Sequence, residues 1–443
     1  MSAALSGYYL RLAGIYLRKN VVMTLLIVLT VGIGVATCVS AYTILYVMSR
    51  DPIPEKSSQL FAVQVDNWGP TSRKPGDSEP PTQLSYLDAN ALLTAARGVH
   101  QVAMYAISMM VMPDDASRKP FNVDARAASR DFFSMFNVPM LYGGAWSVED
   151  ERDGMDSVVI SKDLNDQLFG GANSVGRTIR LRNVPYRISG VMDDWNPLPR
   201  YYDVIGGYEF TKGQDIIIPF HNAISRQIPM SGGYMYCDAG PPGEGFKGTL
   251  LSECVWIQYW VELPSAADQS AFREYLTNYA RTQQDLGRFR WGANVRLSDV
   301  KTWLVNRKVV PDDARLSALV AFGFLLVCLV NAIGLTLANV RRRSSEFALR
   351  RALGARRGDI FVQCIVEATL NGLVGGLLGI ALILLALWTV RTTLGGNVAV
   401  VANASLAVLA GAVLLAVLST VAAGIYPAWW STRIAPATRI KEG

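Results

Sequence analysis

The sequence predicts a membrane protein with four transmembrane helices and one large extracytoplasmic α+β domain inserted between the first helix and the second. Of the 443 residues, 51% are apolar and only 18% are charged, which is less charge than a soluble protein usually carries. The apolar residues concentrate near the two ends of the chain, whereas the middle has the composition of a soluble domain. Four apolar stretches exceed the roughly 20 helical residues that cross a bilayer.

The four apolar stretches define the expected spans. The first, 21–49, is uncharged and longer than the hydrophobic part of a cleaved signal peptide, so we expect it to remain as an anchor. The second is 316–340. The third, 360–390, carries one acid, Glu367, and the fourth is 404–426. One span before the large domain and three after it make a 1 + 3 topology.

Basic residues predict on which side of the membrane each segment lies. Arginine and lysine outnumber the acids in 1–20, 341–359 and 427–443, and cytoplasmic segments carry such an excess. We therefore expect a multi-pass protein of the bacterial inner membrane with both termini in the cytoplasm. The first segment reads as an amphipathic helix, the last as a cytoplasmic tail, and 391–403 as a short periplasmic loop. Basicity confined to these segments argues against nucleic acid as a partner.

Residues 50–297 alternate between strand and helix patterns, which predicts the extracytoplasmic α+β domain. Strands are expected at 59–65, 102–112, 121–127, 157–160, 178–181, 186–191, 216–219 and 256–263. Helices are expected at 85–96, 162–169 and 267–283, with a short helix or turn at 130–136. Residues 298–315 are polar, amphipathic and continuous with the second span, so we expect a stalk helix that extends it.

The segment 225–250 is rich in glycine and proline and is expected to be a long loop, which in a compact domain is usually functional or mobile. Its exposed apolar side chains are candidates for contact with a periplasmic partner or cargo, with core packing as the alternative: Met230, Tyr234, Met235 and Tyr236. Cys237 and Cys254 can form a disulfide in an oxidising compartment, and two free thiols are the alternative.

Several kinds of chemistry are not expected. The two histidines have no spaced cysteine or histidine partners, so no metal site is predicted. No G-x-x-x-x-G-K-[ST] sequence is present, so this chain lacks the P-loop through which ATP is bound and hydrolysed. The acid pairs at 193–194 and 312–313 are typical of a turn or of the stalk rather than of catalytic carboxylates. We predict no catalytic residue and no cofactor in this chain.

The strongest local signal is 341–367, RRRSSEFALRRALGARRGDIFVQCIVE, which is too charged for a bilayer and too apolar for a free tail. Its apolar residues can share one face among the arginines: Phe347, Leu349, Ala352 and Leu353. Gly354 allows a sharp turn before Asp359 caps the next helix. The pattern predicts a short amphipathic helix that docks a soluble partner, and binding to anionic membrane lipid is the alternative.

The same segment resembles the coupling-helix motif of the MacB/FtsX-type ABC transporter permeases (type VII, the mechanotransmission family), usually E-I-x-x-x-R-A-x-G-A. We assign this motif to Glu346, Arg350, Ala352, Gly354 and Ala355, with Phe347 in the aliphatic position. Residues 158–191 are similar to the periplasmic core signature of the family, including F-G and V-G-x-T-I. Residues 424–428, followed by Pro436, resemble its closing pattern, and the 1 + 3 topology is that of the family.

The resemblance implies a permease that dimerises with a second, identical or related chain and sits on two copies of a cytoplasmic ABC ATPase, which binds the ATP and magnesium. Closure of the ATPase would move the coupling helices and thereby the outer domain. The expected function is export of a periplasmic substrate or lipoprotein-like cargo, with a periplasmic adaptor and an outer-membrane channel as further partners. A transmembrane regulator of a periplasmic enzyme or sensor kinase is the alternative. Glu367 either pairs with an arginine of the coupling region or extends to the membrane surface.

Overall fold

The computed structural model describes residues 14–15, 20–69, 71–73, 78–113, 118–207, 209–238, 243–393 and 406–433. The chain divides into two compact units, one of Met1–Ser49 with Val310–Gly443 and one of Arg50–Val309. Most of the expected helix at 1–20, of the loop at 391–403 and of the tail at 427–443 lies outside the described residues.

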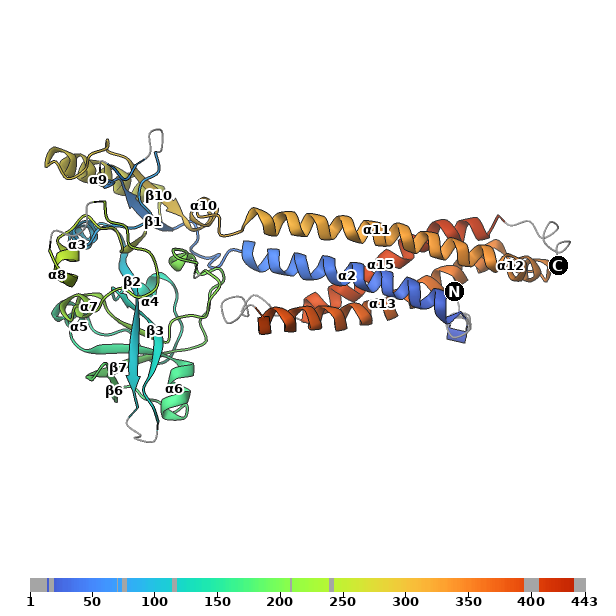
Figure 1. The fold of residues 1–443 in the computed structure, drawn as a ribbon, viewed down its shortest axis with the longest axis horizontal. Helices are drawn as coiled ribbons and strands as arrows, with labels where there is room; N and C mark the ends of the chain where they lie inside the picture. The colour runs from blue at the N-terminus through green and yellow to red at the C-terminus, as the bar shows by residue number, and fades with distance from the viewer. Residues whose placement is uncertain are drawn as a thin grey trace. The chain divides into compact units, whose positions relative to one another are not determined.

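Four long apolar helices build the first unit (Figure 1). They are α2 (Val21–Ser49), α11 (Asp312–Arg342), α13 (Arg357–Thr393) and α15 (Leu406–Ser431). Each is long and apolar enough to cross a membrane, so the four expected spans are confirmed. The ends of α2 agree with the expected 21–49, whereas those of the other three helices differ from the expected ones. The last helix continues to Ser431 instead of ending at 426, with Pro427 inside it.

Glycines allow α13 to approach two neighbouring helices at once. A Cβ atom on Gly372 would lie 2.7 Å from the Cα atom of Val417 on α15, and Gly376 faces the same helix one turn later. Gly375 and Gly379 face α2, where added Cβ atoms would meet backbone oxygens at 3.6 and 3.5 Å. Close backbone approach through small residues is a common way for helices to associate in lipid.

The second unit contains a ten-stranded mixed sheet in the order β10-β1-β9-β2-β3-β8-β5-β7-β4, with β6 paired to β2 and β7. The strands are β1 (Leu60–Val65), β2 (His100–Met112), β3 (Phe121–Ala128), β4 (Met140–Gly143), β5 (Ser157–Ser161), β6 (Thr178–Leu181), β7 (Val184–Met192), β8 (Ile216–Pro219), β9 (Gln258–Glu262) and β10 (Val295–Asp299). Two clusters of buried apolar side chains pack around it. The expected α+β domain between the first two spans is therefore confirmed.

Helices connect and cover the strands, and all of them except α9 are short. They are α3 (Tyr86–Ala95), α4 (Phe132–Met135), α5 (Val148–Asp153), α6 (Lys162–Phe169), α7 (Phe220–Ser225), α8 (Gly245–Leu250), α9 (Ala266–Asp285) and α10 (Val300–Asn306), with a 3-10 turn at Tyr201–Asp203. The helices α3, α6 and α9 begin at serine N-caps, Ser85, Ser161 and Ser265, whose hydroxyls accept from the backbone N–H three residues later. Such a cap satisfies a donor that the helix itself leaves unpaired.

The first and last strands of this domain are direct neighbours. β1 pairs antiparallel with β10, and Phe61 near the start of β1 lies opposite Asp299 at the end of β10. Just outside this pair, the Lys301 ammonium lies 3.3 Å from the Asp51 carboxylate. The chain therefore enters and leaves the domain through one pair of hydrogen-bonded strands at one edge of the sheet.

The expected stalk helix over 298–315 is wrong as a single helix. Its first two residues belong to β10, α10 covers the next seven, and α11 begins only at Asp312. Pro311 lacks an N–H and disfavours helical conformation in the residue before it. Lys308 has a positive φ of 50°, which also interrupts a right-handed helix. The amphipathic pattern indicated helix correctly but did not reveal this break.

Candidate functional site

A short helix, α12 (Ser344–Ala352), connects α11 to α13. It has Glu346 in its first turn and Arg350 and Arg351 in its last turn, so each charge is stabilised by the helix dipole. The helix is shorter than the expected 341–359, because the first two of those residues complete α11 and the last three begin α13.

The chain reverses after α12 through a glycine turn. Gly354 has a φ of +104°, a conformation that residues with a Cβ atom rarely adopt. Its N–H donates to the Arg351 carbonyl at 3.1 Å, and the Ala355 N–H donates to the Arg350 carbonyl at 3.0 Å. This pair of bonds is the Schellman motif that ends many helices. The Asp359 carboxylate then accepts from the Arg356 N–H at 3.0 Å at the start of α13.

Five side chains around this turn form a closed circuit of hydrogen bonds, the charged ring: Arg343, Glu346, Arg350, Gln363 and Glu367. Arg343 donates to Glu367 at 2.7 Å and to Glu346 at 3.1 Å. Arg350 donates to Glu346 and to Gln363, both at 2.7 Å. The Gln363 amide closes the circuit by donating to Glu367 at 3.0 Å. The ring fixes α12 against α13.

The inner part of the charged ring is buried. Arg343 and Glu367 are each 8% exposed, so their ion pair is largely removed from water. Burial alone would lower the pKa of the Arg343 guanidinium, but the carboxylates of Glu367 and Glu346 outweigh burial and raise it. Arg343 therefore stays charged and forms ion pairs with both Glu346 and Glu367. Glu367 was expected either to pair with an arginine of this region or to extend to the membrane surface. In the structure it pairs with Arg343.

The expected apolar face of the docking helix requires a correction. Phe347 is fully buried and packs with Ile360 and Ala428 in the transmembrane unit, whereas Leu349 is 56% and Leu353 80% exposed. Residues two apart on a helix do not face the same way, so Phe347 and Leu349 cannot share a face. The exposed apolar residues of this turn are Leu349, Ala352 and Leu353, the leucine face.

The arginine of the family motif also requires a correction. In the motif E-I-x-x-x-R the arginine stands five positions after the glutamate. Counted from Glu346, this position is Arg351 and not the assigned Arg350. The Arg351 guanidinium lies 3.5 Å from the Thr432 carbonyl at the end of α15, whereas Arg350 belongs to the charged ring. Sequence reasoning missed Arg343 and Gln363 as members of this ring. Gln363 and Glu367, four residues apart in an apolar span, were the available signal.

The candidates in the outer domain lie close together. The structure joins Cys237 and Cys254 in a disulfide. Tyr234 and Met235 are exposed, while Met230 is half-buried against the core. Tyr236 is half-buried and packs its ring edge-on to that of Trp68, with ring centres 4.9 Å apart. Within the described ranges, no three histidine, cysteine or acidic side chains gather where they could hold a metal ion.

Two protein families match the chain in sequence. Residues 24–279 match the MacB-like periplasmic core domain, and residues 318–436 match the FtsX-like permease C-terminal domain. The macrolide export ATP-binding/permease protein MacB of Shigella boydii is 24% identical over 430 residues, covering 94% of this chain and 57% of the relative. The pyoverdine export ATP-binding/permease protein PvdT of Pseudomonas aeruginosa is 29% identical over 315 residues, covering 69% of this chain and 40% of the relative.

The chain thus spans about half the length of these curated relatives. Among solved structures, the periplasmic region of MacB from Actinobacillus actinomycetemcomitans is 12% identical, with a TM-score of 0.36, over 57% of this chain and 94% of that one. The periplasmic core match alone covers more than half of the chain. Together with the four apolar helices, it shows a multi-pass inner-membrane protein that belongs to the MacB/FtsX-type ABC transporter permeases.

Proposed function

We propose that this chain is a permease subunit of an ABC exporter, and that its leucine face docks an ATP-binding subunit in the cytoplasm. The proposal rests on the two faces of α12, of which one is hydrogen-bonded to α13 and the other is exposed. The charged ring binds the helix to α13, while Leu349 and Leu353 remain exposed. Two exposed leucines one turn apart on a short helix are suited to insertion into a groove of a partner.

The charged ring would make α12 a firm mechanical connection. A force applied to the leucine face reaches Arg350 and Glu346 on the same helix, and then Gln363 and Glu367 on α13 through hydrogen bonds of 2.7 to 3.0 Å. Arg343 adds a direct link from the end of α11 to Glu367. Movement of α12 would therefore be passed to both helices, and α11 connects directly to the outer domain in sequence.

Membership of the family supports a proposal for the assembly. The relatives are named as export proteins with ATP-binding and permease functions, and the present sequence contains no P-loop. We infer that two copies of a separate ABC ATPase bind a dimer of permease chains, with α12 and both termini in the cytoplasm. The work done in the periplasm is export of a periplasmic substrate or lipoprotein-like cargo, with an adaptor and an outer-membrane channel as further partners.

Co-purification tests the docking step. A tagged chain is isolated from its native membranes, and the retained P-loop protein is measured by mass spectrometry and by ATPase activity. The double variant Leu349→Glu and Leu353→Glu is expected to lose the ATPase, because carboxylates cannot enter an apolar groove without cost. The matched control is Leu286→Glu, which changes an equally exposed leucine of the outer domain (69%). Equal ATPase retention by both variants would refute docking through the leucine face.

A further inference from the structure

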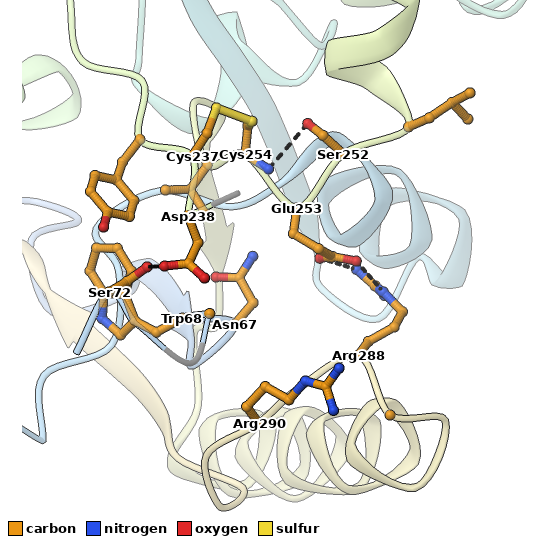
Figure 2. Close-up of a pocket in the computed structure, with 15 residues that line it drawn as sticks. Asn67, Trp68, Ser72, Cys237, Asp238, Ser252, Glu253, Cys254, Arg288 and Arg290 are labelled. Atoms are coloured by element: carbon orange, nitrogen blue, oxygen red, sulfur yellow. Dashed lines mark hydrogen bonds and ion pairs between the residues drawn. A yellow bond between two sulfur atoms is a disulfide. The ribbon is translucent and has the colours of Figure 1, made fainter. Parts of the chain in front are cut away.

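The outer domain contains a cavity of about 390 Å³ beside the Cys237–Cys254 disulfide (Figure 2). Its walls come from the loop after β1, the disulfide-linked segments on either side of α8, and the loop after α9. Trp68 and Tyr236, in edge-to-face contact, supply an aromatic wall. The volume lies within the range of small-molecule pockets, and nothing in the docking proposal uses it.

One residue that lines this cavity has a buried hydrogen-bond acceptor without a donor. Asn67 is 4% exposed, and its amide nitrogen donates to Asp88 at 3.3 Å. Its side-chain oxygen is buried and accepts no hydrogen bond from any residue that the structure describes. A buried polar atom is normally paired. The cavity is therefore short of a donor at Asn67.

The Asp238 carboxylate adds negative charge to the same cavity. It accepts from the hydroxyls of Ser72 and Thr71, and these hydrogen bonds lower its pKa, so it remains ionised at neutral pH. Hydroxyls satisfy a carboxylate only in part, because it has about four lone-pair positions. Asn67 and Asp238 together favour a ligand group that donates hydrogen bonds and carries positive charge, such as an ammonium.

Arg290 favours a negatively charged ligand group in another part of the same cavity. The neighbouring Arg288 is fully used, since it donates twice to Glu253 at 2.8 Å and once to Asp88 at 3.0 Å. Arg290 also lines the cavity but forms no ion pair or hydrogen bond with the described residues. An uncommitted guanidinium favours a carboxylate or phosphate. The cavity thus offers acceptors from one wall and a cation from another.

We propose that this cavity binds a small zwitterion. Its ammonium meets the Asn67 oxygen and the Asp238 carboxylate, and its acid group meets Arg290. Trp68 and Tyr236 contact the apolar part of the ligand and attract the ammonium through their ring faces. Two sources share this chemistry: a free α-amino acid and the phosphoethanolamine group of a lipid. The site does not depend on the leucine face, so it stands or falls separately from ATPase docking.

Calorimetric titration of the full chain in detergent tests the proposal with matched compounds. L-phenylalanine and O-phosphoethanolamine are the two zwitterions, while 3-phenylpropionate and phenethylamine each carry only one of the two charges. At least one zwitterion is expected to bind at least tenfold more tightly than either half compound, because a hydrogen bond to a charged group contributes about that factor. The better zwitterion identifies the source.

Two variants locate the charges. Arg290→Gln should weaken zwitterion and 3-phenylpropionate binding about tenfold but leave phenethylamine unchanged. Asp238→Asn should weaken zwitterion and phenethylamine binding and leave 3-phenylpropionate unchanged. The control is Arg281→Gln, an exposed arginine of α9 outside the cavity. Failure of both zwitterions to bind more tightly than the half compounds overturns the proposal, as does an Arg290→Gln effect no larger than that of the control.

Discussion

The guanidinium of Arg343 donates to the carboxylate of Glu367 at 2.7 Å, across 24 residues of sequence, and both side chains are buried. This pair joins the end of α11 to the first part of α13. A buried ion pair contributes little net stability, yet it is costly to break, because the remaining charge is left without a partner.

The variant Glu367→Gln should therefore lower the free energy of unfolding by about 3 kcal/mol, at the lower end of values for broken buried pairs because an amide still accepts one hydrogen bond. The measurement is thermal unfolding of the purified chain in detergent. Lys162→Gln is the control, since it removes exposed ion pairs with Asp193 and Asp194, which contribute little to stability. Equal losses would mean that the Arg343–Glu367 pair is not effectively buried.

Gly354→Ala should destabilise the turn after α12 by about 1–3 kcal/mol, because a residue with a Cβ atom is strained at a φ of +104°. The added Cβ itself would meet no atom within 4 Å, so the whole effect comes from the backbone. Gly358→Ala is the matched control, because Gly358 lies in α13 with equally open surroundings. It should be neutral or slightly stabilising. Thermal unfolding that ranks the two variants the other way round would contradict the turn geometry.

Gly372→Ala should separate α13 from α15, because the new Cβ would lie 2.7 Å from the Cα atom of Val417 and in contact with the Thr420 hydroxyl. Overpacking of this kind costs about 1–3 kcal/mol. Gly411→Ala on α15 adds the same atom where nothing lies within 4 Å and should have little effect. Unfolding midpoints in detergent compare them, and a harmless Gly372→Ala would show that the two helices are not in close contact.

The stability of the outer domain should fall as the pH rises between about 4.5 and 7. Burial raises the pKa of Glu151 from 4.5 to about 7, against the hydrogen bonds from Trp146 and from the Arg130 backbone that lower it. The folded domain therefore binds a proton that the unfolded chain releases in this window, and this contribution is complete below pH 4.5 and lost above pH 7. Unfolding measured against pH should show the slope.

Glu151→Gln should remove this part of the pH dependence, because the amide keeps an acceptor for the Trp146 indole N–H, which donates to Glu151 at 2.5 Å, and cannot ionise. The control Glu149→Gln changes an exposed acid of the same helix and should leave the slope in place. A slope that survives Glu151→Gln must come from another group.

Sequence patterns located most long or strongly patterned elements. The apolar run of 102–112 and the helical segment 162–169, bounded by the glycines at 170–171, predicted β2 and α6 closely, because both signals are local. Shorter elements such as β4 and α5 were not predicted. A strand of four residues, Met140–Gly143, depends on its partner β7 rather than on its own pattern, and non-local pairing of this kind leaves little trace in a single sequence.

The candidate site was predicted in position and only partly in detail. The glycine at 354 and the capping acid at 359 correctly marked a turn between two helices. The direction of each side chain was harder to predict from the sequence, because Phe347 and Leu349 are equally apolar. Only the packing of α13 and α15 decides which of the two is buried. The charged ring joins residues 24 positions apart, and no local pattern reports such a contact.

The pairing of β1 with β10 determines how the outer domain responds to load. Both strands are attached to membrane helices at the same end of their ladder, where Phe61 lies opposite Asp299. If α2 and α11 move in the same direction, the two strands travel together and no hydrogen bond between them is stretched. If the helices move apart, tension falls first on the bonds at the end where the two strands connect to α2 and α11, and the ladder would open one pair at a time. The Lys301–Asp51 ion pair lies just before that point, where it resists the first step of peeling.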